Sequence, residues 1–267
     1  MIIFLIIFLM ILIVIISLLI IYFLKCDNFN DTFLNNTIIV NFFTKDLCEE
    51  WKNHIYTLKK YNLDKYVIVF PLDNDALNCV KSENIRYNTK LLNKINISQG
   101  NFGDKNFKKI VYYKFLAIKN YLDLNYNVFY LDTDTILFGD IIEDIKTFPK
   151  NNDLYAQKDG TGICSGCMLI LPTNNSKLLI NNCLKYYENK KIENDPLMDQ
   201  DIINKLVKEL KIKYHLLAWK KYASGDDYFN KHKEYFKNNK PLFLHNNFIV
   251  GLKAKTERFK KHGLWYI

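Results

Sequence analysis

The chain has 267 residues, of which 49% are hydrophobic, 15% aromatic and 24% charged, and its formal net charge is +9. This composition excludes a disordered chain, because so many aromatic side chains bury enough surface to offset the loss of chain entropy. It also excludes a polytopic membrane protein, since the sequence holds a single apolar run long enough to cross a bilayer. Nine Gly and five Pro exclude a collagen-like or linker-dominated chain.

The apolar run lies at the amino terminus, where residues 2–24 carry no charged side chain. As a helix rising about 1.5 Å per residue, this run would be about 35 Å long, enough to cross a bilayer with some tilt. It lacks the basic start, the shorter apolar core and the small residues at a cut site that mark a cleaved signal peptide. We therefore expect residues 1–25 to form an uncleaved transmembrane signal anchor and residues 26–36 to form a polar stem.

Short apolar strands alternate with amphipathic helices along residues 37–267. The predicted strands cover residues 37–43, 66–70, 85–87, 127–131, 153–157, 167–171, 212–217 and 241–244. The predicted helices cover residues 45–61, 73–81, 108–124, 173–190, 199–210 and 252–262, and a loop is expected at 94–106. Continuous apolar strands with intervening helices predict an α/β fold, in one domain, whose mostly parallel sheet is covered by helices on both faces.

The most informative segment is the apolar strand 127–131, which runs directly into Asp132 and Asp134. Ligands of open α/β sheets bind beyond the carboxyl ends of the strands. Two carboxylates there can supply oxygen ligands to Mg²⁺ or Mn²⁺, and such a cation can neutralise a departing nucleoside diphosphate. Two solvated Asp residues in a polar turn are the simpler alternative, but their place directly after an apolar strand favours a metal site.

The same two residues allow a rival interpretation as a haloacid-dehalogenase-like phosphatase, with Asp132 as nucleophile and Asp134 as general acid/base. Against it, Ile136 occupies the position where such enzymes usually have Thr or Val. The second acidic cluster follows at 139–144, far too close, and an extended α/β pattern precedes a strand that should come first. These departures make the phosphatase a remote alternative.

Further short motifs follow one another in a recognisable order. They are Thr44 after the first strand, Lys114, YLDTD at 130–134, SGCMLILPT at 165–173, Asp199-Gln200-Asp201 with Asn204, His245-Asn246-Asn247 with Gly251 and Lys255, and Gly263-Leu264-Trp265. In this order and spacing the chain resembles the nucleotide-diphospho-sugar transferases of the type that includes plant xylosyl- and arabinosyltransferases of cell-wall synthesis. More distantly it resembles the glycogenin-like retaining transferases.

The resemblance implies a GT-A-type fold, Rossmann-like, with a nucleotide-binding first half and an acceptor-binding second half. It implies that Asp132, Asp134 and His245 hold Mn²⁺ or Mg²⁺, a role that suits a neutral imidazole. It also implies a set of residues that contact the nucleotide sugar, namely Lys114, Asp132, Thr133, Asn247, Gly251 and Lys255. Asp199 and Gln200 would be catalytic residues beside the transferred sugar.

Simpler roles stay open for several of these residues. Lys114 could be a solvated helix lysine, and Asp199 with Gln200 could be an ordinary polar pair at a helix N-terminus. Lys253 could take the place of Lys255 at the diphosphate.

The chain departs from the family at Cys164-Ser165-Gly166-Cys167, where relatives commonly read Asn-Thr/Ser-Gly. A redox or zinc role for Cys164 and Cys167 is disfavoured, because Cys167 enters a strand and no second cysteine pair exists. The departure leaves the acceptor pocket open.

These features together predict a metal-dependent glycosyltransferase that moves a sugar from a UDP- or GDP-linked donor to a glycan or glycoprotein acceptor. The resemblance implies that the anomeric configuration is retained. The alternative is a degenerate transferase that acts as a membrane-anchored glycan-binding or scaffold protein. A nucleic-acid partner is not expected, because the lysines are dispersed and no recognition motif accompanies them. On these functional grounds we expect a type II protein of the ER or Golgi with its catalytic domain in the lumen, where some of the six cysteines could form disulfides.

Overall fold

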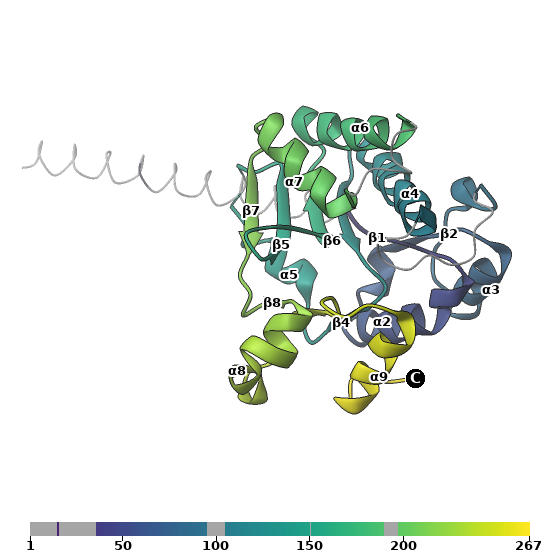
Figure 1. The fold of residues 1–267 in the computed structure, drawn as a ribbon, viewed down its shortest axis with the longest axis vertical. Helices are drawn as coiled ribbons and strands as arrows, with labels where there is room; N and C mark the ends of the chain where they lie inside the picture. The colour runs from purple at the N-terminus through teal and green to yellow at the C-terminus, as the bar shows by residue number, and fades with distance from the viewer. Residues whose placement is uncertain (1–14, 16–35, 95–104, 150, 190–196) are drawn as a thin grey trace, which may run out of the picture. The chain divides into compact units, whose positions relative to one another are not determined.

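A six-stranded sheet with the order β2-β1-β3-β6-β5-β7 forms the centre of the unit that spans Thr37–Ile267 (Figure 1). The computed structural model describes residues 15, 36–94, 105–149, 151–189 and 197–267. The strands are β1 (Thr37–Phe43), β2 (Val67–Pro71), β3 (Asn127–Leu131), β5 (Leu154–Asp159), β6 (Gly162–Ile170) and β7 (Tyr214–Leu217). Three of the five strand pairings are parallel, and β6 is antiparallel to both of its neighbours. The predicted mostly parallel sheet is thereby confirmed.

A smaller sheet with the order β4-β9-β8 lies beyond the carboxyl end of β3. Its strands are β4 (Thr135–Leu137), β8 (Tyr222–Ala223) and β9 (Phe243–His245). β4 pairs with β9 in antiparallel register, which sets Thr135 directly opposite His245. A segment more than a hundred residues away in the sequence is thereby fixed beside the turn that follows β3.

Helices cover the large sheet on both faces. Residues of α4 (Lys105–Leu122), α6 (Asn174–Glu188) and α7 (Asp199–Glu209) share one hydrophobic cluster with alternate residues of the strands (Figure 1). On the opposite face, Phe43 of β1 stacks on Trp51 of α2 (Cys48–Lys60). The remaining helical segments are η1 (Lys45–Leu47), η2 (Asp64–Tyr66), α3 (Asn74–Ser82), η3 (Thr89–Leu91), α5 (Ile141–Ile145), the π-helix η5 (Asp227–Lys231), α8 (Lys233–Asn238) and α9 (Leu252–Lys261).

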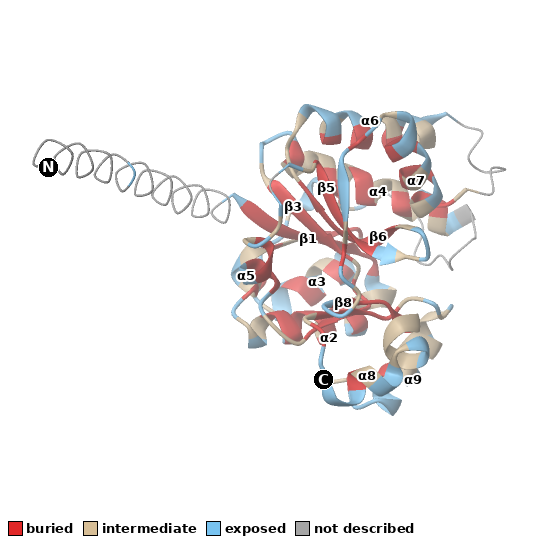
Figure 2. Cartoon of the chain, turned by 90° about the vertical axis from the view of Figure 1, so that its left-hand side faces the viewer, coloured by how far each residue is buried: buried red, intermediate tan, exposed pale blue. Residues whose placement is uncertain are grey.

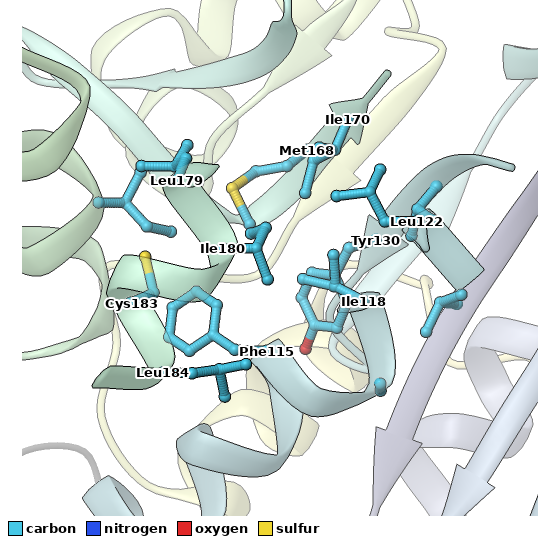
Figure 3. Packing of buried hydrophobic residues seen from close by; sticks show 14 of the residues in the cluster. Phe115, Ile118, Leu122, Tyr130, Met168, Ile170, Leu179, Ile180, Cys183 and Leu184 are labelled. Carbon is cyan, nitrogen blue, oxygen red and sulfur yellow. The ribbon is translucent and has the colours of Figure 1, made fainter. Parts of the chain in front are cut away.

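The apolar face of α4 forms the centre of this core. Phe115, Ile118 and Leu122 are fully buried against Tyr130 of β3, and Met168 of β6 closes the cluster (Figure 3). Each large apolar side chain removed from water in this way contributes about 1.5–3 kcal/mol. Figure 2 shows the strands of the large sheet buried and the outward helix faces exposed, as the alternation of apolar and polar residues predicts.

Local sequence signals set several helix boundaries. Asp73 is the N-cap of α3, and its carboxylate accepts a hydrogen bond from the Ala76 amide at 2.7 Å. Thr173 caps α6 and forms a reciprocal capping box with Ser176. Asp140 caps α5 by accepting from two backbone amides.

Three predicted strands differ from the structure. The predicted strand 167–171 begins earlier, because β6 spans Gly162–Ile170, and Cys164 therefore lies within the strand. The predicted strand 85–87 is a single bridge between Tyr87 and Val69. The Val69 amide donates to the Arg86 carbonyl at 3.0 Å, and the Val69 carbonyl accepts from the Asn88 amide at 2.8 Å. The predicted strand 212–217 begins at Tyr214, since Lys211 adopts a left-handed conformation and the Ile212 amide still closes the end of α7. The short elements β4, α5, β8, η5 and α8 were not predicted.

The predicted anchor and stem, residues 1–36, lie outside the described residues apart from two positions. The loop expected at 94–106 also falls mostly outside them. Within the described part of the chain, no helix combines the length and the apolar character needed to cross a bilayer.

Candidate active site

The turn that follows β3 carries the two carboxylates and is tied down on three sides. The Asp132 amide donates to the Gly166 carbonyl of β6 at 2.8 Å, and the Thr135 hydroxyl donates to the Asp132 carbonyl at 2.9 Å. The Asn246 amide donates to the Asp134 carbonyl at 2.9 Å. The backbone therefore holds Asp132 and Asp134 in place between the two sheets.

Asp132, Asp134 and His245 come together at this turn, as the resemblance implies. The His245 Nε2 atom lies 3.3 Å from Asp134 Oδ1 and 3.6 Å from Asp132 Oδ2. One ligand atom from each of the three residues lies within 4.8 Å of the others. Two carboxylate oxygens and one imidazole nitrogen are a donor set that suits Mn²⁺ or Mg²⁺, so the residues fit the expected metal.

The charges at this cluster are strongly coupled. Burial alone would raise the pKa of Asp134, but Lys255 and His245 outweigh it and hold that pKa well below its usual range. Burial likewise opposes a charged imidazole, yet the Asp134 carboxylate prevails and holds the pKa of His245 well above its usual value. Asp134 is thus ionised and faces positive charge on two sides.

Lys255 is the cation that reaches this site from α9. Its Nζ atom lies 2.8 Å from Asp134 Oδ2, whereas the side chain of Lys253 is 91% exposed and lies 3.9 Å from Glu257. The side-chain amide of Asn246 donates from Nδ2 to the Lys255 carbonyl at 2.9 Å, which fixes the start of α9 against the carboxylate turn. Of the two lysines considered, Lys255 lines the cavity and Lys253 does not.

Lys114 is buried and links the two acidic motifs. Its Nζ atom lies 2.7 Å from Asp199 Oδ2, 3.6 Å from Asp132 Oδ1 and 4.9 Å from the centre of the Tyr130 ring. Burial works against the charged ammonium, but Asp132 and Asp199 outweigh it and raise the pKa of Lys114. A solvated helix lysine is thereby excluded at this position.

Asp199 and Gln200 open α7 and face β6 and β5. Asp199 is 2% exposed, and it accepts a hydrogen bond from the Ser165 hydroxyl at 2.6 Å. The Gln200 side chain donates to Asp159 Oδ2 at 3.0 Å and accepts from the Ser165 amide at 3.4 Å. An ordinary solvated pair at a helix N-terminus does not make such contacts, and both residues line the cavity over the carboxylate turn.

A cavity of about 670 Å³ opens over this cluster, and such a volume suits a nucleotide-sized ligand. All the site residues expected from the sequence line it: Lys114, Asp132, Thr133, Asp134, Asp199, Gln200, His245, Asn247, Gly251 and Lys255. The Asn247 side chain accepts from the Gly225 amide at 2.7 Å, and Gly251 has a φ of +93°, a conformation that favours glycine.

Gly166 lets the metal ligands approach β6. A Cβ atom on this residue would lie 2.3 Å from His245 Cε1 and 2.4 Å from Asp132 Oδ2. Because Gly166 has no side chain, the backbone of β6 packs directly against His245 and Asp132. Gly166 stands in the motif at residues 165–173, which suggested no role for it.

Several further residues of the site were not predicted. The Tyr130 hydroxyl donates to Asp132 Oδ1 at 2.6 Å, and Gln157 accepts a hydrogen bond from His245. Behind the carboxylate turn, His54 Nδ1 lies 2.9 Å from the Thr135 hydroxyl. Tyr130 stands in the YLDTD motif and could have been singled out, whereas Gln157 and His54 carry no local sequence signal.

Among the described cysteines, two form a disulfide, and Cys164, Cys167 and Cys183 are free. Cys48 and Cys79 form a disulfide between the start of α2 and the helix α3. Cys164 and Cys167 of β6 are buried free thiols, and the metal-binding cluster found among the described residues does not include them.

Comparisons with known proteins agree with this geometry. The nucleotide-diphospho-sugar transferase family profile matches residues 62–259. A UDP-galactose:fucoside alpha-3-galactosyltransferase of Dictyostelium discoideum is 29% identical over 196 residues, which cover 62% of this chain and 29% of that protein. The UDP-D-xylose:L-fucose alpha-1,3-D-xylosyltransferase MGP4 of Arabidopsis thaliana is 28% identical over 190 residues, covering 62% of this chain and 52% of that protein.

Solved structures show the same fold. A glycosyltransferase involved in the glycosylation of the major capsid of PBCV-1 superposes with a TM-score of 0.56 at 11% identity, over 84% of this chain and 98% of that one. The galactosyltransferase LgtC, solved with donor and acceptor sugar analogues, gives a TM-score of 0.52 at 14% identity, over 78% of this chain and 86% of that one. With the GT-A-type fold and the family profile in agreement, the chain belongs to the nucleotide-diphospho-sugar transferase family.

Proposed function

We propose that the chain is a metal-dependent glycosyltransferase that transfers a sugar from a UDP-sugar to a glycan or glycoprotein acceptor. The observation that carries this proposal is the cluster of Asp132, Asp134 and His245 at the floor of a nucleotide-sized cavity, with Lys255 beside it. Asp132, Asp134 and His245 would hold Mn²⁺ or Mg²⁺, and the metal would neutralise charge on the departing diphosphate.

The chain's own residues supply the remaining electrostatics. Lys255 presents a cation to the cavity from α9, where it can stabilise negative charge on the leaving group. Lys114 forms ion pairs with both Asp132 and Asp199, which fix the position of the carboxylate turn relative to the start of α7. Preorganised charges of this kind stabilise a transition state without reorganisation during the reaction.

We infer that Asp199 and Gln200 lie beside the transferred sugar. Lys114 and Ser165 both bond Asp199, so we infer that Asp199 orients its neighbours and does not itself react. Gln200 lies between the Ser165 amide and Asp159, on the same wall of the cavity. We propose retention of the anomeric configuration, since the names of both relatives give alpha linkages, and UDP-galactose and UDP-xylose are themselves α-linked donors.

The two relatives suggest which substrates to test first. Their names give UDP-galactose or UDP-xylose as the donor and a fucose-bearing acceptor. The chain spans 29% and 52% of the lengths of these two relatives. We propose a UDP-linked hexose or pentose as donor and a glycan ending in L-fucose as the first acceptor to try.

We also propose that the protein is a type II membrane protein of the ER or Golgi, with residues 37–267 in the lumen. The apolar run of residues 2–24 supports an anchor, and the Cys48–Cys79 disulfide supports an oxidising compartment. Glycosylation scanning in microsomes would test the orientation: glycosylation of a sequon placed in the described domain supports a lumenal domain, and its absence contradicts it.

The activity is tested by incubating the purified chain with Mn²⁺ and a panel of UDP- and GDP-sugars, with and without L-fucosides. We expect hydrolysis or transfer from at least one UDP-sugar, loss of activity in EDTA, and loss of activity in Asp134→Asn. Lys253→Ala is the matched control, because its exposed side chain does not line the cavity. Turnover that is indifferent to EDTA and to Asp134→Asn would contradict the proposal.

A further inference from the structure

Gln157 of β5 is fully buried, and its amide makes contacts on both sides. Its Nε2 atom lies 2.8 Å from the Ala223 carbonyl and 3.3 Å from the Tyr222 carbonyl, both on β8. An amide nitrogen donates two hydrogen bonds, and these two carbonyls accept them. The reverse orientation would set the Gln157 oxygen against two carbonyl oxygens, so β8 fixes which end of the amide faces the other way.

The end that faces the other way is the carbonyl oxygen, and it meets His245. Gln157 Oε1 lies 3.1 Å from His245 Nδ1. An amide oxygen can only accept a hydrogen bond, so Nδ1 must be the nitrogen that carries hydrogen. When the ring holds one proton, Nε2 is therefore the nitrogen with the free electron pair, and Nε2 is the atom that faces Asp132 and Asp134.

The neighbouring thiol would permit the opposite arrangement. Cys164 Sγ lies 3.4 Å from the same His245 Nδ1, and a thiol can donate as well as accept. A donated S–H would leave Nδ1 without hydrogen and place the proton on Nε2, pointing at the carboxylates. A protonated Nε2 does not bind a cation, so the Gln157 oxygen decides between a competent and a blocked ligand.

We propose that Gln157 is a positioning residue for the metal site. The β8 carbonyls fix the orientation of its amide, and its amide oxygen in turn sets the tautomer of His245. This inference rests on the proposed function, since it takes Asp132, Asp134 and His245 as the ligands of a divalent cation. Histidine ligands in metalloproteins have their second nitrogen bound by such a partner, and loss of the partner weakens metal binding about 10- to 100-fold. The small sheet thus supplies both the ligand, from β9, and the anchor of its orientation, from β8.

The test compares two variants that each lose one buried amide. Gln157→Met keeps the length of the side chain but removes the acceptor. Asn53→Leu is the matched control, because Asn53 is 1% exposed, bonds the Leu264 carbonyl and the Tyr266 amide, and does not line the cavity. Free Mn²⁺ is measured by electron paramagnetic resonance during titration of each metal-free protein.

We expect Gln157→Met to bind Mn²⁺ about 10- to 100-fold more weakly than the wild type, and Asn53→Leu to lose thermal stability with unchanged Mn²⁺ affinity. Wild-type affinity in a folded Gln157→Met overturns the role of Gln157 and leaves the proposed function standing. Failure of the wild-type chain to bind Mn²⁺ overturns the proposed function and this inference with it.

A second measurement needs no variant of Gln157. Long-range ¹H–¹⁵N spectra of histidine-labelled protein with Mg²⁺, assigned through His245→Gln, report which ring nitrogen carries hydrogen. We expect hydrogen on His245 Nδ1 in the Mg²⁺-bound protein. Hydrogen on Nε2 in that state would overturn the proposal even if Gln157→Met does not fold.

Discussion

Replacement of Gly166 by alanine is the smallest change that should disturb the metal ligands directly. The φ angle of Gly166 is not positive, so an alanine fits the backbone, and the conflict comes from the added methyl group alone. That methyl would lie 2.3 Å from His245 Cε1 and 2.4 Å from Asp132 Oδ2. An ordinary contact needs about 3.5 Å, so each ligand, or β6 itself, must move by roughly 1 Å.

Neither ligand can move freely. The Tyr130 hydroxyl and Lys114 hold Asp132, and Gln157 holds His245. Metal sites tolerate errors of about 0.2 Å in ligand distance, and a misplacement of about 1 Å in an active site can lower the rate by about 100-fold. We therefore expect Gly166→Ala to lower kcat/KM by about 100-fold, which is about 2.7 kcal/mol of transition-state stabilisation.

The assay combines an Mn²⁺ titration with steady-state turnover of the donor that the panel identifies. Gly139→Ala is the control, because its methyl would lie 2.5 Å from a terminal carbon of Leu242, away from the site. Overpacking by either substitution should cost about 1–3 kcal/mol of stability, but only Gly166→Ala should weaken Mn²⁺ binding and turnover. Equal Mn²⁺ affinity and kcat/KM in Gly166→Ala and wild type would refute the placement of both ligands against β6.

Three further outcomes are expected. Lys255→Met should lower kcat by about 10²–10³-fold. Its Mn²⁺ affinity, measured by titration, should stay the same or rise, because a cation that competes for Asp134 is removed, and a large fall in affinity would contradict this. Burial lowers the pKa of His54 from 6.5 to about 4, so between these pH values the unfolded chain binds a proton that the folded chain does not. The free energy of unfolding should therefore fall by about 3 kcal/mol as the pH drops from 6.5 to 4. Urea unfolding of His54→Asn should lack that loss. Cys79→Ala opens a disulfide with a sequence separation of 31, which should cost about 3–4 kcal/mol of stability without changing Mn²⁺ affinity, and equal unfolding midpoints would argue against a disulfide between Cys48 and Cys79.

The parts of the fold that the sequence predicted are those with strong local patterns. The apolar strand β3 and the stripe of α4 have clear periodicity, and both pack as expected. The carboxylate pair was predicted because an apolar strand ends directly in Asp132. By contrast, β4 and β8 have three and two residues, too few to show any periodicity.

Tertiary contacts define the site residues that sequence patterns missed or that only the resemblance identified. Gln157 stands in a strand where its polarity looks like an ordinary outward position, yet it is fully buried between β8 and His245. Lys114 looks like any lysine on an amphipathic helix, and its burial follows from carboxylates 18 and 85 positions further along the chain. His245 was identified by resemblance alone, because the β4–β9 pairing that brings it to Asp134 joins two short segments.

Calorimetric titration of UDP into the purified chain tests the central claim most directly. With Mn²⁺ present we expect UDP to bind to the wild-type chain, with affinity lost in EDTA and in Asp134→Asn. Absence of UDP binding in the presence of Mn²⁺, or equally tight binding in EDTA, would contradict a metal-dependent nucleotide-sugar site at Asp132, Asp134 and His245.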